Sequence, residues 1–368
     1  MRKVLDICLQ KDVTTFLYES LPLCVVLGQP QLYEWFLQHY VEMYLVDAKK
    51  GEQYNFYAVR YAETTSYLQY SKVKEVLTYN QLEAAVVNSK VNIVDFLKVQ
   101  IDCGVYAVVF LNEWAIPHKQ SYHKEHWYHE SLVYGYDDDK GTLLCVSFDE
   151  HRNFTSFEVD YHSFWDGFQL ICNDPSDIAA YQRYLYLLKP QDKACRFNMA
   201  RFVHQLDNLL RDRMDMIDRY NLDLMDLPTP REDWTYSFGL SLLDRFSHIL
   251  QTKYRNGAEI SYLDFHILKE SRRLMHKRLA YLHAHYIPGG RMEELVGRYE
   301  KVADSFDVAR NLFLKLDRLQ RTGGDRERGE GYLQRIVELL QNAKQTETEL
   351  LAAVRTLAAE AIEGGYAA

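Results

Sequence analysis

Hydrophobic and polar positions follow two different patterns along the chain. In the first half, short apolar runs such as YNFYAVRYA, GVYAVVFLNEW and FTSFEVD are typical of strands, and VNIVDFLKVQID has a helical period. The segment SLVYGYDDDKGTLLCVSF has two apolar runs around Asp-Asp-Asp-Lys-Gly, which predicts a β-hairpin. Because apolar residues recur at helical spacing in LYEWFLQHYVEMYL, we also expect a helix over residues 32–45.

The pattern changes after CNDPSD, which begins at Cys172. From there to the end of the chain it is mainly amphipathic at a period of 3.6 residues, with IPGGR and RTGGDRERGEG as loops. A chain of 368 residues is long enough for two domains. We therefore predict an α+β domain over residues 1–173 and an α-helical bundle over residues 174–368.

Composition narrows the classes of function. The formal net charge of −9 disfavours a nucleic-acid partner, whose phosphates need a basic surface. No apolar run reaches the length of a membrane helix, and MRKVLDICLQKD lacks the apolar centre of a signal peptide. The six cysteines are scattered without CxxC spacing, which is typical of free thiols in a cytoplasmic protein.

Four histidines lie close together at positions 118, 123, 126 and 129. Part of this group has the spacing His-x-x-His-x-x-His, which suggests a zinc site. Neither HExxH nor a pair of cysteines accompanies it, so we expect no metal. The simpler interpretation is a group of polar residues on a loop before a strand.

His129 has a further interpretation, because it stands at the entrance to a core strand. A general base needs a rigid element and an orienting hydrogen bond on its second ring nitrogen. Asp149, on the returning strand of the hairpin, is our candidate for that acid. Cys8 is the candidate nucleophile, since it stands where the first apolar segment gives way to a helical pattern and a helix N-terminus favours a thiolate. A buried small residue is the alternative for Cys8, and Cys103 is the second-choice nucleophile.

The chain resembles a known family at several of these motifs. The early cysteine, WFLQHYVEMYL, YAVVFLNEWAIP and above all HWYHESLVYGYDDD resemble papain-like, peptidase C39-like proteins typified by the N-terminal domain of butirosin biosynthesis protein H. The helical segments YLDFHILKESRRLMHKRLAYL and RNLFLKL resemble the region that follows this domain in relatives from peptide and polyketide gene clusters. The likeness spans nearly the whole chain, and its histidine segment is the specific part.

The resemblance implies a papain-like domain that transfers acyl groups from thioesters on carrier proteins to amines. Cys8 matches the family nucleophile and His129 the base. Relatives place the acid where this chain has Phe148, so Asp149 is displaced by one residue. The glutamine that such enzymes place before the cysteine is absent, which leaves Gln10, or the backbone amides at Cys8 and Leu9, to bind the oxyanion.

The expected substrate is an acyl group on the phosphopantetheine arm of a carrier protein, with no other cofactor. Trp35, Tyr40 and His126 are candidates for the wall of the cleft, and core packing is the alternative for the two aromatic residues. The best candidate for a basic patch that docks an acidic carrier is ESRRLMHKRLAYLHAHY, with Arg272, Arg273, Lys277 and Arg278. A solvated helix face explains these residues equally well.

Two other functions fit the same residues. A cysteine peptidase acting on a precursor peptide would use the same three side chains. A non-catalytic scaffold would bind carrier proteins through its helical half. The sequence also leaves the oligomeric state open, with a homodimer among the states considered.

Overall fold

Two compact units make up the part of the chain that the structure describes. The computed structural model describes residues 1–50, 53–62, 72–173, 179–214 and 234–365. The first unit is Met1–Phe36 with Thr65–Cys195, and the second is Leu37–Thr64 with Arg196–Ala368. Each contains an antiparallel sheet and helices, so the fold is mixed α and β.

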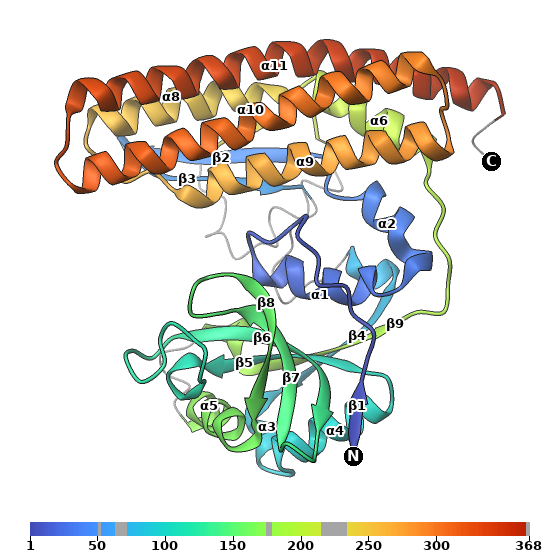
Figure 1. Ribbon diagram of the computed structural model, residues 1–368, viewed down its shortest axis with the longest axis vertical. Helices are drawn as coiled ribbons and strands as arrows, with labels where there is room; N and C mark the ends of the chain where they lie inside the picture. The colour runs from blue at the N-terminus through green and yellow to red at the C-terminus, as the bar shows by residue number, and fades with distance from the viewer. Residues whose placement is uncertain (51–52, 63–71, 174–178, 215–233, 366–368) are drawn as a thin grey trace. The chain divides into compact units, whose positions relative to one another are not determined.

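A seven-stranded antiparallel sheet organises the first unit (Figure 1). The hairpin predicted from the sequence is confirmed as β6–β7, and β5 and β8 are the predicted strands on either side of it. The short strand β1 pairs with the far end of β6. In spatial order the strands are β4 (Leu77–Glu83), β9 (Tyr184–Pro190), β5 (Tyr106–Asn112), β6 (Tyr128–Asp137), β7 (Thr142–Phe148) and β8 (Phe154–Asp160), with β1 at Arg2–Val4.

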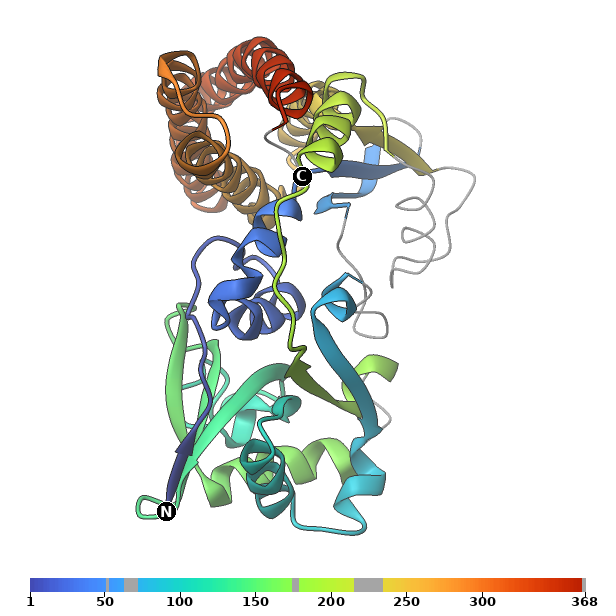
Figure 2. The ribbon, with the colours of Figure 1, turned by 90° about the vertical axis from the view of Figure 1, so that its right-hand side faces the viewer.

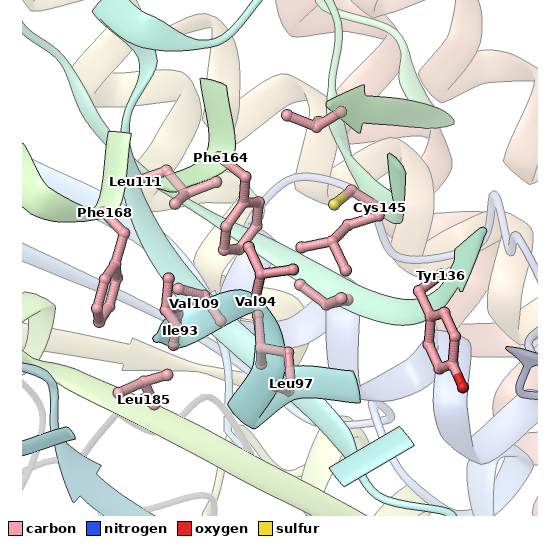
Figure 3. Close-up of a cluster of buried hydrophobic side chains, with 14 of the residues drawn as sticks. Ile93, Val94, Leu97, Val109, Leu111, Tyr136, Cys145, Phe164, Phe168 and Leu185 are labelled. Carbon is pink, nitrogen blue, oxygen red and sulfur yellow. The ribbon is translucent and has the colours of Figure 1, made fainter. Parts of the chain in front are cut away.

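Helices lie on both faces of this sheet. α1 lies on one face and α3, α4 and α5 lie on the other (Figures 1 and 2). Apolar side chains of β5, β6 and β7 pack against α4 and α5, as Val109, Leu111 and Phe164 do in Figure 3. The α-helices are α1 (Leu17–Leu27), α3 (Ala84–Asn88), α4 (Ile93–Asp102) and α5 (Tyr161–Asn173), and the single-turn 3₁₀ helices are η1 (Pro30–Leu32), η3 (Val73–Glu75), η4 (Glu113–Ala115) and η5 (Ala180–Arg183).

The helix predicted over residues 32–45 is wrong in its second half. α2 (Tyr33–Gln38) ends early, and β2 begins at Met43. Tyr40 lies between them with a φ of 59°, a left-handed conformation that no α-helix continues through. β2 is buried between two neighbouring strands, and a short apolar run of this kind has no periodicity that separates strand from helix.

A three-stranded sheet and long helices form the second unit. The sheet has the order β10 (Trp234–Phe238), β2 (Met43–Lys50) and β3 (Gln53–Tyr61). The long amphipathic helices predicted for the C-terminal half are confirmed, and the first of them, α6, ends at Leu210. The helices are α6 (Met199–Leu210), η6 (Gly239–Ser241), α8 (Leu242–Arg255), α9 (Tyr262–His285), α10 (Gly290–Arg321) and α11 (Arg326–Glu363).

The chain divides differently from the predicted boundary at residues 173 and 174. β9 follows that boundary in sequence but pairs with β4 and β5 in the first unit. β2 and β3 precede it but pair with β10 in the second unit. Pairing between strands far apart in sequence decides the division, and a single-sequence pattern does not report such pairing.

Two of the four basic residues expected to dock a carrier protein are buried. The Arg278 guanidinium donates to the backbone carbonyls of Leu37 and His39, and Arg272 is bonded to Glu347. Arg273 is half-exposed, and its guanidinium pairs with carboxylates of α10. Arg272 and Arg278 therefore stabilise the second unit internally. None of the described helices is long and apolar enough to cross a membrane.

Candidate active site

His129 is oriented by a buried carboxylate. It is the second residue of β6 and pairs with Leu111 at the end of β5. Glu113 begins η4 directly after β5, so the strand pairing brings the two side chains together. His129 Nδ1 lies 3.1 Å from Glu113 Oε1. The imidazole side chain is 33% exposed, whereas the carboxylate side chain is only 7% exposed.

Glu113 has a second partner in Lys119. The Lys119 Nζ lies 3.1 Å from the same Oε1 atom, and the lysine side chain is 2% exposed. Its ammonium also donates to Ser147 Oγ at 2.8 Å and to the Phe148 carbonyl at 2.7 Å. A buried ammonium with three acceptors is well satisfied, so Lys119 holds Glu113 in place from the protein interior.

The charge state of Glu113 determines the tautomer of His129. Burial alone raises the pKa of this carboxyl, but the hydrogen bond from His129 and the charge of Lys119 outweigh it and hold the pKa below its usual value. The ionised carboxylate accepts, so the His129 Nδ1 carries the proton. His129 Nε2 is then the nitrogen with a free lone pair, as a general base requires.

Asp149, the acid expected from the sequence, lies in a turn after β7. Its Oδ1 accepts the backbone N–H groups of His151 and Asn153, both at 2.8 Å, and its Oδ2 accepts from the Asn153 side chain. Burial raises the pKa of Asp149, but these donors outweigh it and keep the pKa low. The acid that contacts His129 is therefore Glu113. The sequence held a signal for Glu113 in FLNEW. There a carboxylate directly follows the buried strand β5, which pairs with the strand that carries His129.

Cys8 is exposed but does not begin a helix. α1 begins at Leu17, and the Cys8 backbone N–H donates to the carbonyl of Cys24 at 2.9 Å. Cys8 thus lies beside the C-terminal half of α1, away from the N–H groups that were expected to favour a thiolate. No hydrogen bond or ion pair of the described residues joins Cys8 to His129.

The side chain of His129 and the segment of Cys8 belong to opposite faces of the sheet. Residues paired directly across an antiparallel ladder share a face, so His129 lies on the face of Leu111, which packs against α5. The side chain of Tyr106 points to the other face, since it is an odd number of residues from Leu111. Its hydroxyl donates to the carbonyl of Asp6, two residues before Cys8, at 2.6 Å.

The proposed oxyanion residues lie in the segment before α1. The Gln10 side chain is buried; its Oε1 accepts from the backbone N–H groups of Asp12 and Val13, and its Nε2 donates to the Val13 carbonyl. The Gln10 amide therefore closes a turn of its own backbone. Leu9 is half-buried in the same segment. Neither position contacts the His129–Glu113 pair by a hydrogen bond among the residues described.

The three residues expected to line a cleft have separate environments. Trp35 is buried in the first unit, where its indole N–H donates to Glu75 at 2.9 Å. Tyr40 is buried in the second unit, edge-on to Tyr61. Both therefore act as core residues. His126 is exposed and hydrogen-bonds Asn112 through Nδ1.

The loop between β5 and β6 places Trp127 beside His129. Trp127 is 53% exposed, and its ring lies edge-on to His129 with centroids 6.1 Å apart. The loop is held closed by the Glu113 backbone N–H, which donates to the Trp127 carbonyl at 2.8 Å. His118 and His123 both have positive φ angles, so the loop adopts a specific and strained backbone.

No group of three or more His, Cys, Asp or Glu side chains in the described ranges is placed to hold a metal ion. No family model matches the chain, and no curated protein is significantly similar to it. The His129–Glu113–Lys119 arrangement determines the chemistry open to this site. That arrangement can accept a proton from a substrate at His129 Nε2 and hold the resulting imidazolium against Glu113.

Proposed function

We propose that the first unit catalyses acyl transfer from a carrier-bound thioester to an amine, with His129 as the general base. The observation that carries this proposal is the 3.1 Å contact between His129 Nδ1 and the buried Glu113. The thioester and the carrier protein come from the resemblance of the histidine segment to papain-like relatives. A helix packed on an antiparallel sheet, with a histidine at the start of a strand, supports that resemblance without deciding it.

The reaction needs one proton acceptor. The substrate amine attacks the thioester carbonyl, and His129 Nε2 takes the proton that the amine loses as the C–N bond forms. Glu113 stabilises the imidazolium. The tetrahedral intermediate then expels the carrier thiolate, which takes the proton from His129. The products are an amide and a free carrier thiol, and the base is restored.

We infer that the amine attacks the thioester directly, without an acyl-enzyme on Cys8. The support is the placement of Cys8 beside α1 and of His129 on the α5 face of the sheet. A covalent route would need the Cys8 thiol to reach His129 Nε2. The two routes give the same amide, and they differ in whether Cys8 carries the acyl group.

The direct test measures amide formation from S-acyl N-acetylcysteamine thioesters, which imitate the phosphopantetheine arm, and a primary amine such as benzylamine. We expect the full-length chain to accelerate amide formation and His129→Gln to abolish the acceleration. His162→Gln is the matched control, because His162 is an exposed histidine on α5. Equal rates for wild type and His129→Gln would overturn the proposal, and cleavage of peptides instead of thioesters would favour a peptidase.

A further inference from the structure

Lys119 is a buried cation that contacts the site without facing solvent. The Glu113 Oε1 lies 3.1 Å from Lys119 Nζ and 3.1 Å from His129 Nδ1. Lys119 therefore shares its carboxylate oxygen with the base. Burial lowers the pKa of Lys119, and the neighbouring carboxylate opposes this effect.

Charge balance links Lys119 to the protonation of His129. With Lys119 and Glu113 both ionised and His129 neutral, the three side chains sum to zero charge. Without the lysine, the carboxylate would be a buried charge with no cation to balance it. The pair of Glu113 and His129 would then take up a proton at a higher pH. Whether this proton binds the carboxylate or the imidazole, His129 no longer presents Nε2 as a base opposite an ionised Glu113.

We propose that Lys119 is a positioning residue for His129: it neutralises Glu113, so that the imidazole stays a neutral base with its proton on Nδ1. This inference rests on the proposed function only in calling His129 a base. It concerns the charge state of the pair, which is measurable without a substrate.

Other charged and titratable groups lie near the pair without contacting Glu113 in the part of the chain that the structure describes. Cys145 on β7 is fully buried, which raises the pKa of its thiol to about 12 and keeps it neutral. Asp149 acts on Lys119 from the turn after β7, and it is itself held by backbone donors. From α5, which packs against η4, His162 and Asp166 form an exposed pair. Lys119 is the cation among these groups that contacts Glu113.

The experiment follows His129 by ¹⁵N–¹H spectra of the imidazole, with the signal assigned by its loss in His129→Gln. The spectra report which ring nitrogen is protonated and the pH midpoint of proton uptake. Lys119→Met keeps the aliphatic stem and removes the charge. Glu113→Gln removes the opposite charge. Lys124→Met is the control, because Lys124 lies in the same loop with its ammonium on the exposed Gln120 carbonyl.

Opposite shifts are expected from the two charge changes. In Lys119→Met the midpoint rises by about one pH unit or more, because the carboxylate is no longer balanced. In Glu113→Gln it falls, because a buried ammonium without its carboxylate opposes an imidazolium. Lys124→Met leaves it unchanged. An unchanged midpoint in Lys119→Met, or shifts of the same sign in both variants, would overturn the inference.

A double variant guards against loss of folding. Lys119→Met alone leaves a buried carboxylate unbalanced, whereas Glu113→Gln with Lys119→Met removes both charges. If the single variant does not fold, the double variant must fold, and its midpoint must lie above that of Glu113→Gln because the unbalanced ammonium is gone. A double variant that keeps the shift of Glu113→Gln would contradict the role of Lys119. If these shifts are observed but the chain transfers no acyl group, the proposed function is refuted and the role of Lys119 stands.

Discussion

The backbone N–H of Cys8 donates to the carbonyl oxygen of Cys24 at 2.9 Å. This bond attaches the segment after β1 to the C-terminal half of α1. The Asp6 carbonyl, two residues before Cys8, contacts Tyr106 on one face of the sheet, whereas the His129 imidazole belongs to the other face. Cys8 is exposed, and no hydrogen bond of the described residues joins it to the His129–Glu113 pair.

Iodoacetamide should alkylate Cys8 and leave turnover nearly unchanged. Cys8 is exposed, whereas burial raises the pKa of Cys24 and of Cys145 to about 12 and shields both thiols. Peptide mass spectrometry identifies the modified thiols, and the thioester assay measures the remaining rate. An acyl group recovered on Cys8 during turnover, with loss of activity in Cys8→Ala, would re-establish the covalent route.

Glu113→Gln should lower kcat by about 10²- to 10⁴-fold, because the neutral amide neither holds the Nδ1 tautomer nor stabilises the imidazolium. Asp149→Asn is the matched comparison, since it tests the acid expected from the sequence. We expect Asp149→Asn to keep kcat within about twofold and to lower stability by about 1 kcal/mol through its turn. A larger loss of kcat from Asp149→Asn than from Glu113→Gln would reverse the assignment.

Glu130 should make the first unit less stable as pH rises. Burial raises the pKa of this carboxyl to about 8, against about 4.3 in an unfolded chain. The folded state therefore binds the proton more tightly than the unfolded chain does. The contribution of Glu130 to the free energy of unfolding is fully present below about pH 4 and is lost as pH rises to about 8. The slope is at most about 1.4 kcal/mol per pH unit.

Urea denaturation of wild type and Glu130→Gln across that range measures the effect of Glu130. The variant should show a flatter dependence on pH and become relatively more stable at pH 9. Parallel curves for the two proteins over the whole range would show that Glu130 titrates normally.

Arg272→Met should destabilise the second unit by about 3–5 kcal/mol, because it leaves the buried Glu347 without its cation. Arg273→Met, one residue away, should cost about 1 kcal/mol or less, since Arg273 pairs with Asp304 and Asp307 at a partly exposed site. Denaturation midpoints of the two variants test this difference. Equal losses would mean that Arg272 is not the internal anchor described above.

Docking of a carrier was one interpretation of the arginines in this segment, and the burial of Arg272 and Arg278 contradicts it for those two residues. A helix face rich in arginine has the same sequence signature whether water or neighbouring carboxylates solvate it. Only the packing of α9 against α10 and α11 brings the carboxylate of Glu347 to Arg272.

The sequence by itself determined the local elements of this protein and the place of His129. Short apolar runs and the turn residues between them identified β5, the β6–β7 hairpin and β8, and the 3.6-residue period identified α9, α10 and α11. These signals depend on near neighbours in the chain. The tertiary structure decided which carboxylate meets the imidazole and where Cys8 lies. Both depend on strand register and on pairing between distant segments, and these are set by packing energies summed over the whole sheet.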